Sequence, residues 1–301
     1  MRPAERELTA DWTLTEDLEA FLDRAGGFLR SHPARHTVPL TVTETLRRLG
    51  PHAYGDGVPV FGLLERAGAV RAAFFRTPPR RPNLTSLSGQ DADALADRLA
   101  DLGHSLPGVT ADRETAAAFA EAWERRTGAA AVLRRRERLY RLGTLTAPEP
   151  APPGRARVAS EADRSRLTAW HGEFAEAVGE HGPRDSGTWA DDRIAYGGIT
   201  LWETPDGTPA AMAGATRPIA GQLRIGPVYT PAHLRGRGYA GAATVEVSRA
   251  ALASGVDEVL LFTDLANPTS NGLYQRIGYQ PVADFATYEF TAHDITATAA
   301  P

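Results

Sequence analysis

Residues 225–250 read IGPVYTPAHLRGRGYAGAATVEVSRA, a strand pattern followed by a loop rich in Gly and Arg and then a helix pattern. Small residues in such a loop let the backbone approach an anion closely. The start of the helix that follows offers N–H groups without acceptors and the positive end of the helix dipole. The stretch therefore predicts that residues 235–240 bind a phosphate or pyrophosphate group.

Two kinds of phosphate-binding fold are compatible with this loop. Residues 236–241, GRGYAG, form a G-x-G-x-x-G, and Asp257 and Glu258 lie near the spacing of the ribose-binding acid in a dinucleotide fold. In that fold the first Gly closely follows a strand of a parallel βαβ unit. Here residues 231–235, PAHLR, intervene and the strands upstream form a hairpin, so the dinucleotide fold is the less favoured alternative.

The hydrophobic pattern of the second half predicts alternating helices and strands. Helical spacing covers residues 161–179, 188–197, 239–254 and 268–278. Strand patterns cover residues 198–203, 209–220, 222–230, 258–264 and 279–290, of which the first two form a hairpin.

The first half repeats this order in fainter form, which indicates two copies of one unit. Its expected helices cover residues 13–30, 41–50, 91–103 and 113–128, and its expected strands cover residues 58–65, 69–79, 83–88 and 132–142.

A proline-rich stretch separates the two halves. Residues 146–157 read TAPEPAPPGRAR, and Pro fixes φ and donates no amide hydrogen bond, so the stretch is typical of a linker. We therefore expect one domain at residues 1–146, a linker at 147–157, a second domain at 158–290 and a flexible tail at 291–301.

Composition excludes several chemistries. The 301 residues contain no Cys, and all 33 basic residues are Arg, which excludes thiolate nucleophiles, thiolate zinc sites, P-loop lysines and Schiff-base lysines. His32 and His36 stand four apart, but Pro33 lies between them, and no metal site is predicted.

Charge and hydropathy bear on the partners. The net charge is −4, and from Arg155 onward 12 Arg stand against 17 Asp and Glu, so neither half has the basic excess of a nucleic-acid binder. No apolar stretch reaches the ~20 residues of a membrane span. We expect a cytoplasmic protein, a monomer or a homodimer, that binds neither nucleic acid nor membrane.

Two spaced motifs carry a family resemblance. Arg235, Gly238 and Ala240 match the signature Q/R-x-x-G-x-G/A, and residues 267–279, NPTSNGLYQRIGY, match N-x-x-A/S-x-x-L-Y-x-x-x-G-F/Y. With both motifs the sequence resembles the GNAT superfamily of N-acetyltransferases over residues 155–290. The whole chain resembles the tandem form with a degenerate N-terminal copy, since the first half lacks R-x-x-G-x-G. The resemblance implies an α/β (α+β) fold of two tandem domains, each a mixed, mostly antiparallel sheet flanked by helices.

The resemblance also implies a cosubstrate, acetyl-CoA, held where the fourth strand (Leu223 to Thr230) splays from the fifth at a bulge. Pro227 suits that bulge because it lacks an N–H group. The implied contacts are the acetyl and pantetheine contacts of Val228, Tyr229 and Thr230, the pyrophosphate contacts of Arg235, Gly236, Arg237, Gly238, Tyr239 and Ala240, and the arm contacts of Asn267 and Asn271.

The activity that the resemblance implies is acetyl transfer to a small-molecule amine. Tyr274 would protonate the departing thiolate, although a half-buried core tyrosine is the alternative for this residue. Glu203 is the predicted general base, and the other candidates are Glu173, Glu176, His171 and His181. A CoA-sensing or partner-binding module without activity is the alternative function, and the acceptor amine is left open.

Overall fold

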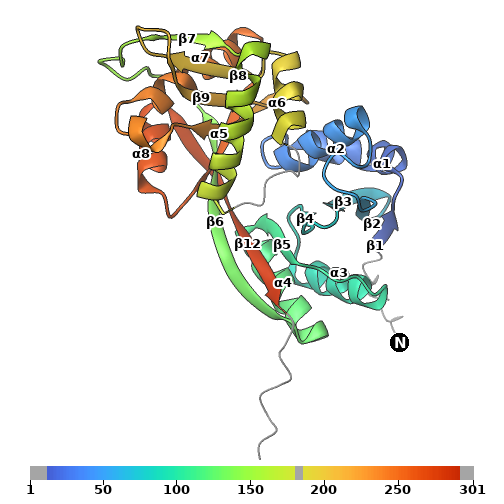
Figure 1. Cartoon of the computed structure of the whole chain (residues 1–301). Coiled ribbons are helices and arrows are strands. Elements are labelled where there is room, and N and C mark those ends of the chain that lie inside the picture. The colour runs from blue at the N-terminus through green and yellow to red at the C-terminus, as the bar shows by residue number, and fades with distance from the viewer. Residues whose placement is uncertain (1–11, 180–185, 292–301) are drawn as a thin grey trace, which may run out of the picture. The chain divides into compact units, whose positions relative to one another are not determined.

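The computed structural model describes residues 12–179 and 186–291 and divides into two compact units (Figure 1). Among these residues, unit 1 takes 12–32, 45–136 and 284–291, and unit 2 takes 33–44 and 137–283. Each unit combines a sheet with helices, which confirms the predicted α/β class with two such units.

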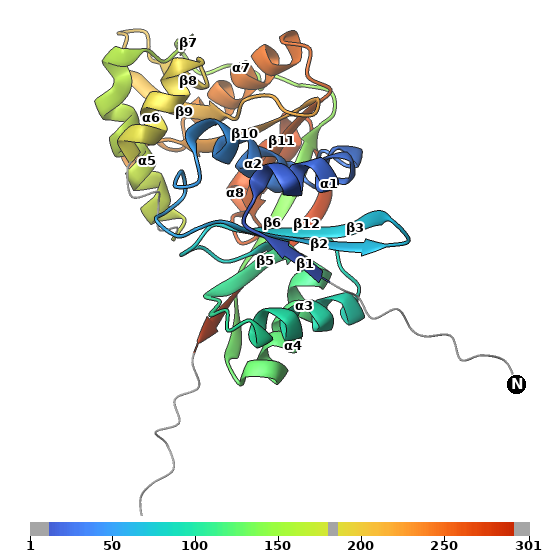
Figure 2. The same ribbon diagram turned by 90° about the vertical axis from the view of Figure 1, so that its right-hand side faces the viewer.

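Unit 1 is built on a mostly antiparallel sheet in the order β1-β2-β3-β4-β5-β12, in which only β4 and β5 pair parallel. Figure 2 shows α1 on one face of this sheet and α3 with α4 on the other. The elements are β1 (Trp12–Thr15), α1 (Leu18–Ser31), β2 (Val60–Arg66), β3 (Ala69–Arg76), β4 (Asn83–Leu84), α3 (Gly89–Asp101), β5 (Gly108–Asp112), α4 (Arg113–Thr127) and the last part of β12 (Tyr279–Thr291).

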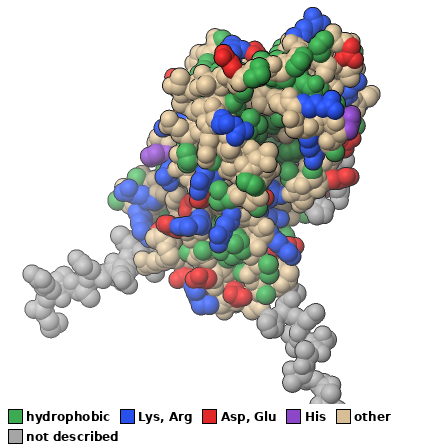
Figure 3. All heavy atoms as spheres, turned by 90° about the vertical axis from the view of Figure 1, so that its left-hand side faces the viewer, with side chains coloured by type: hydrophobic (Ala, Val, Ile, Leu, Met, Phe, Trp, Pro, Cys, Tyr) green, Lys and Arg blue, Asp and Glu red, His purple; other side chains and the backbone are tan. Residues whose placement is uncertain are grey.

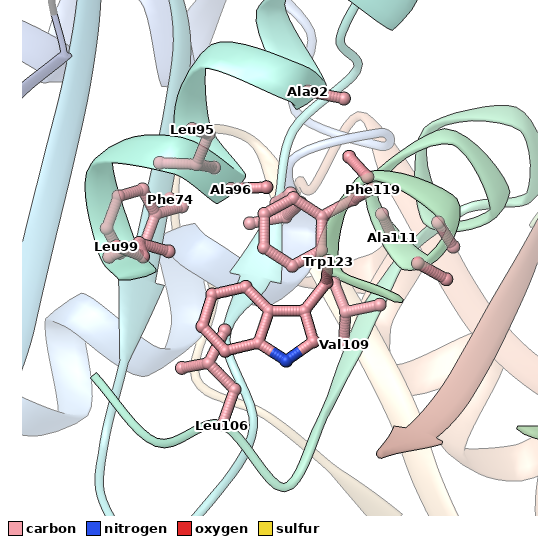
Figure 4. Close-up of a cluster of buried hydrophobic side chains, with 14 of the residues drawn as sticks. Phe74, Ala92, Leu95, Ala96, Leu99, Leu106, Val109, Ala111, Phe119 and Trp123 are labelled. Atoms are coloured by element: carbon pink, nitrogen blue, oxygen red, sulfur yellow. The ribbon is translucent and has the colours of Figure 1, made fainter. Parts of the chain in front are cut away.

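The core of unit 1 is made by apolar side chains from β3, α3 and α4 that point into a common interior (Figure 4). Phe119 and Trp123 of α4 stack with ring centres 6.1 Å apart. Phe290, from the far end of the chain, stacks on Trp123 at 5.9 Å. The C-terminal strand therefore completes the core of unit 1.

Unit 2 has a sheet in the order β7-β8-β9-β10-β11-β6, antiparallel except for the parallel pair β10 and β11. Its strands are β7 (Arg155–Val158), β8 (Ile199–Glu203), β9 (Pro209–Ala215), β10 (Gln222–Tyr229), β11 (Glu258–Asp264) and the last part of β6 (Ala130–Leu142). Its helices are the first part of α2 (Thr37–Leu49), η1 (Glu161–Asp163), α5 (Arg164–Ala177), α6 (Ser186–Ala195), η2 (Ala232–Leu234), α7 (Tyr239–Ala253) and α8 (Pro268–Arg276).

The sheet of unit 2 has two separately packed faces. Ala211 and Ala213 of β9 pack in the cluster that holds α7 and α8, whereas Met212 between them packs in the cluster that holds α5 and α6. This alternation is the period of two expected for a strand. All residues of β8 and β9 are buried, so both faces are covered along these strands.

Two strands do not respect the boundary between the halves that the proline-rich linker predicts. The end of β6, from the first half, pairs with β11 in unit 2, and the end of β12 pairs with β5 in unit 1. The expected domains at residues 1–146 and 158–290 describe the sequence repeat and stay a prediction. The packed units differ from them, because the end of β6 belongs to unit 2 and the end of β12 to unit 1.

Most predicted elements are present, and the differences have local causes. The helix expected from residue 13 begins at Leu18 because Asp17 caps it, accepting from two amides of the first turn, and the preceding residues form β1. The strand expected over residues 83–88 contains only Asn83 and Leu84. The patterns missed β5 and β7, both of which are short.

Arginines along β6 form ion pairs with acidic residues of each unit. Arg134 pairs with Glu289 within unit 1, and Arg141 lies 2.8 Å from Glu258 within unit 2. Figure 3 shows basic and acidic side chains next to one another on the face that it draws. Within the described residues, every helix is too short or too polar to cross a bilayer.

We predict that Phe290→Ala destabilises unit 1 by about 3 kcal/mol, the usual cost of emptying a packed aromatic site. The measurement is the free energy of unfolding in urea, followed by Trp fluorescence. Leu252→Ala, at a side chain 44% exposed on α7, serves as the control and should change it by less than about 1 kcal/mol. Equal effects of the two substitutions would contradict the placement of β12 in this core.

Candidate functional site

The candidate site lies where β10 and β11 part. These strands pair from Gln222 opposite Glu258 only as far as Ile225 opposite Leu261. Beyond that point β10 continues to Tyr229, still paired with β9, and β11 continues to Asp264, still paired with β6. The two strands thus keep their outer partners and separate from each other, as the family resemblance implies.

A bulge in β10 accompanies this separation. Ile225 lies opposite Ala215 and Val228 opposite Ala213, so three steps along β10 match two steps along β9. The irregular stretch contains Gly226 and Pro227, and Pro227 has no N–H to donate. The bulge shifts the alternation of faces by one, so that Val228 packs on the α7 side and Tyr229 on the α5 side.

The loop before α7 presents a row of free backbone donors. Gly236 and Gly238 have φ of 77° and 83°, a conformation that favours glycine. Gly238 is the N-cap of α7 and no side chain caps the helix. The amides of residues 236–241 donate to no acceptor in the described part of the chain. Consecutive free amides at a helix N-terminus form an anion-binding site.

The two arginines of the loop have different partners. Arg235 donates from Nε to the carbonyl oxygen of Thr230 at 3.0 Å, and its guanidinium carbon lies 6.0 Å from the ring centre of Tyr229. Arg237 is exposed and makes only a long contact, 3.4 Å, to the carbonyl of His233. Arg235 thus braces the end of β10, and Arg237 is the arginine available to an anion.

Thr230 adds a second kind of free donor. Its side chain is 9% exposed, and its Oγ1 has no hydrogen-bond partner among the described residues. A buried hydroxyl without a partner is costly, by about 1–3 kcal/mol. The hydroxyl and the row of amides together fit a ligand that carries both phosphate groups and amide or carbonyl groups, which is the chemistry of acetyl-CoA.

The two asparagines of the second motif are used by the fold. Asn267 caps α8, accepting from the amide of Ser270 at 3.0 Å. Asn271 donates to the carbonyl oxygens of Asp264 and Asn267 at 2.7 and 2.8 Å, and its Oδ1 accepts from the hydroxyl of Tyr140 at 2.9 Å. Asn271 therefore holds α8 at the end of β11, and a direct contact of either side chain with the cosubstrate stays a prediction.

Tyr274 of α8 is buried but its hydroxyl is free. The side chain is 7% exposed, and the hydroxyl has no hydrogen-bond partner in the part of the chain that the structure describes. Its ring meets that of Tyr279 edge-on, with centres 6.1 Å apart. Burial raises the pKa of Tyr274 to about 12, so that the phenol keeps its proton at neutral pH. Tyr239 and Val228 belong to the same apolar cluster.

Glu203, the predicted general base, is ion-paired with two arginines, and its catalytic role stays a prediction. It is buried at the end of β8, where Arg157 lies 2.5 Å away and Arg155 3.4 Å away. The hydrogen bond from Arg157 holds the pKa of Glu203 below its usual range. Arg157 also binds both carboxylate oxygens of Asp163, at 2.6 and 2.8 Å. The three side chains fasten β7 and η1 to the sheet.

The other predicted base candidates lie in different places. His171 is buried on α5, stacked on Trp189 at 4.1 Å, and Glu176 is exposed on the same helix. Glu173 accepts a hydrogen bond from the hydroxyl of Tyr229. His181 lies outside the described residues.

Comparisons with known proteins bear on this geometry. Residues 204–288 match the family described as FR47-like protein. A GCN5-related N-acetyltransferase from Sphaerobacter thermophilus is 18% identical, with a TM-score of 0.58 over 95% of this chain and 98% of that chain. A GNAT-family acetyltransferase from Colwellia psychrerythraea is 12% identical, with a TM-score of 0.59 over 93% of this chain and 100% of that chain. The fold is that of the GNAT acetyltransferases.

The likeness extends to the tandem arrangement. A tandem GNAT protein from the clavulanic acid biosynthesis pathway is 14% identical, with a TM-score of 0.54 over 94% of this chain and 100% of that chain. No curated protein matches the chain. The predicted resemblance to the GNAT superfamily in tandem form is confirmed, and the roles of individual GNAT site residues stay predictions.

The ion pair between Arg157 and Asp163 predicts a pH-dependent stability of unit 2. The hydrogen bond from Arg157 lowers the pKa of the buried Asp163 to about 2, below the ordinary value of 3.8. Because the native pKa is depressed, the stabilisation is present above pH 4 and is lost as pH falls toward 2. We expect Asp163→Asn to lower the free energy of unfolding by about 2 kcal/mol at pH 7.

Urea unfolding at pH 7 and at pH 2.5 tests this expectation, and the difference between wild type and Asp163→Asn should shrink at the lower pH. Asp191→Asn is the control, because its ion pair with Arg164 is half exposed and should contribute less than about 1 kcal/mol. A difference for Asp163→Asn that is the same at both pH values would contradict the ion-pair assignment.

Proposed function

We propose that this protein is an acetyl-CoA-dependent N-acetyltransferase that transfers the acetyl group to a small-molecule amine by direct attack on the thioester. The observation that carries the proposal is the row of six free amides, residues 236–241, beside the opening between β10 and β11. The GNAT fold supports acetyl transfer in general. The cytoplasm is the proposed location.

The phosphate groups of the cosubstrate are assigned to the loop. The amides of residues 236–241 and the helix dipole of α7 favour the pyrophosphate, and Arg237 supplies a charge-assisted donor. Arg235 acts indirectly, by holding the carbonyl of Thr230 and thereby the end of β10.

The pantetheine arm is assigned to the opening between the strands. Beyond Ile225 neither strand is paired with the other, so an amide-bearing chain can take the place of a strand there. Thr230 directly follows the last residue of β10, and its unpartnered hydroxyl offers one further hydrogen bond.

The acetyl transfer needs stabilisation of two developing charges. Attack of the amine puts negative charge on the carbonyl oxygen, for which the N–H of Val228 is the proposed donor. As the C–S bond breaks, charge builds on sulfur, for which Tyr274 is the proposed proton donor. Burial raises the pKa of Tyr274 to about 12, so the phenol is protonated at neutral pH and can donate its O–H to the sulfur as the C–S bond breaks.

Calorimetry with acetyl-CoA tests the proposal directly. We expect binding in the micromolar range, roughly −8 kcal/mol, followed by turnover with at least one member of a primary-amine panel. Binding without turnover across the panel would favour a CoA-binding module without activity. The absence of binding to any acyl-CoA would refute the proposal.

We predict that Arg237→Glu weakens acetyl-CoA binding by about tenfold or more, because it removes a charge-assisted donor and places a carboxylate near phosphate. The measurement is the Kd from calorimetry. Arg249→Glu, at the other end of α7 and also exposed, is the matched control and should leave the Kd unchanged. If Arg237→Glu binds like the control, the pyrophosphate lies elsewhere.

We predict that Tyr274→Phe lowers kcat by about 10²-fold or more while the affinity for acetyl-CoA changes little, since the ring stays and only the acidic proton is lost. Tyr279→Phe is the control, because Tyr279 is buried beside it and bonds Ser248 at 2.8 Å. It should cost about 1 kcal/mol of stability and no activity. A Tyr274→Phe enzyme that works at full rate would make Tyr274 a core residue only.

A further inference from the structure

A tyrosine and a glutamate are hydrogen-bonded on the face of the sheet opposite the phosphate loop. The hydroxyl of Tyr229, at the end of β10, donates to Oε2 of Glu173 on α5. Tyr229 is 8% exposed, whereas Glu173 is exposed. The other carboxylate oxygen of Glu173 has no partner among the described residues. The pair therefore connects a buried hydroxyl with solvent.

The bulge in β10 places this pair next to Val228, the proposed contact of the acetyl group. Val228, proposed to face the thioester carbonyl, packs toward α7, and its neighbour Tyr229 packs toward α5 with Trp170, whose ring centre is 6.0 Å away. Because β10 has no pairing with β11 beyond Ile225, Val228 and Tyr229 lie on an unpaired edge of β10, with one side chain on each face. A thioester bound along this edge would have Val228 on its α7 side and the pair of Tyr229 and Glu173 on its α5 side.

The surroundings of the hydroxyl keep it protonated. Burial raises the pKa of Tyr229, and the hydrogen bond to Glu173 adds to this, while Arg235 near the ring opposes it. A protonated phenol that donates to a carboxylate can accept a new proton on its oxygen while passing its own to that carboxylate. Such a two-step relay is a form of general base catalysis.

Resting on the proposed function, we propose that Tyr229 and Glu173 take the proton that the acceptor amine must lose before it attacks. An alkylamine with a pKa near 10 arrives at neutral pH as the ammonium ion, whose nitrogen has no free lone pair. One ammonium N–H bond breaks as its proton passes to Oη of Tyr229, and the phenolic proton passes to Oε2 of Glu173. The amine nitrogen is left with its lone pair, and Glu173 releases the proton to water.

The pair also bears on the substrate class. The exposed carboxylate of Glu173 attracts a cation, and the buried rings of Tyr229 and Trp170 beside it are apolar. We infer a primary alkylamine that is cationic at neutral pH. We prefer Glu173 to Glu203 for this role, since two arginines already compensate the charge of Glu203.

Steady-state kinetics at pH 7 and at pH 9.5 test the relay, with the panel amine that wild type acetylates fastest. We expect Glu173→Gln and Tyr229→Phe each to lower kcat/KM for the amine by about 10-fold to 100-fold at pH 7, with the Kd for acetyl-CoA within twofold of wild type. At pH 9.5 the deficit should shrink, because more of the amine is already neutral in solution. The double variant should be no slower than the slower single variant, since both residues serve one relay.

The other groups that titrate or carry charge near the pair are Arg235, from the loop after β10, Arg166 of α5, which lies over the ring of Trp170, and His171 and Glu176 on α5. They are the same in wild type and in both variants, so the comparison between pH values isolates the substituted group. Glu121→Gln, at an exposed glutamate on α4 of unit 1, is the matched control and should behave as wild type.

The outcomes separate the two proposals. If wild type binds acetyl-CoA and acetylates the amine while Glu173→Gln and Tyr229→Phe keep their kcat/KM, the relay is refuted and the proposed function stands. A deficit that is equal at both pH values would show a structural contribution only and would also refute the relay. If wild type neither binds acetyl-CoA nor acetylates any amine, both proposals fail.

Discussion

The bulge in β10 is the constraint on which the rest of the site depends. One extra residue between Ile225 and Val228 ends the pairing with β11 and exchanges the faces of every residue that follows. Without it, Tyr229 would pack on the α7 side and Val228 on the α5 side. The neighbouring strand accommodates the bulge with Gly214, where a Cβ would lie 2.8 Å from the carbonyl oxygen of Gly226. A single insertion thereby accompanies the separation of β10 from β11 and places Val228 and Tyr229 on opposite faces of the sheet.

The N-terminus of α7 has no side-chain cap, in contrast to those of α1, α3, α4 and α8. Asp17, Ser88, Asp112 and Asn267 cap α1, α3, α4 and α8 with their side chains. A missing cap costs about 1 kcal/mol of helix stability, and the loop glycines add conformational entropy to that cost. The strong packing of α7 against the sheet, with nine of its residues buried, offsets this local loss. The free amides can therefore stay available to a ligand without loss of the helix.

The sequence predicts the elements of unit 2 well because their apolar residues recur with the helical or the strand period. It predicts the phosphate loop because glycines directly precede a helix pattern. It does not predict that Arg235 turns back onto Thr230, since side-chain direction depends on the strand end it meets. The family resemblance assigns Tyr229 to the cosubstrate, which stays a prediction, and the face on which its side chain packs beyond the bulge cannot be predicted from alternation alone. The partners of Glu203 also come from residues of the expected linker, whose last part is the edge strand β7.

The helix of unit 1 that corresponds to α7 in the repeat, α3, shows what the loss of such a site involves. Its N-cap Ser88 accepts from the amide of Asp91, and the carboxylate of Asp91 accepts from Ser88 at 2.7 Å and pairs with Arg66. The strand before it is reduced to Asn83 and Leu84. A negative charge thus already occupies the first turn, where a phosphate would otherwise be stabilised by the helix dipole. An incoming anion would meet this carboxylate, so α3 begins with a side-chain cap and a negative charge where α7 begins with uncapped amides.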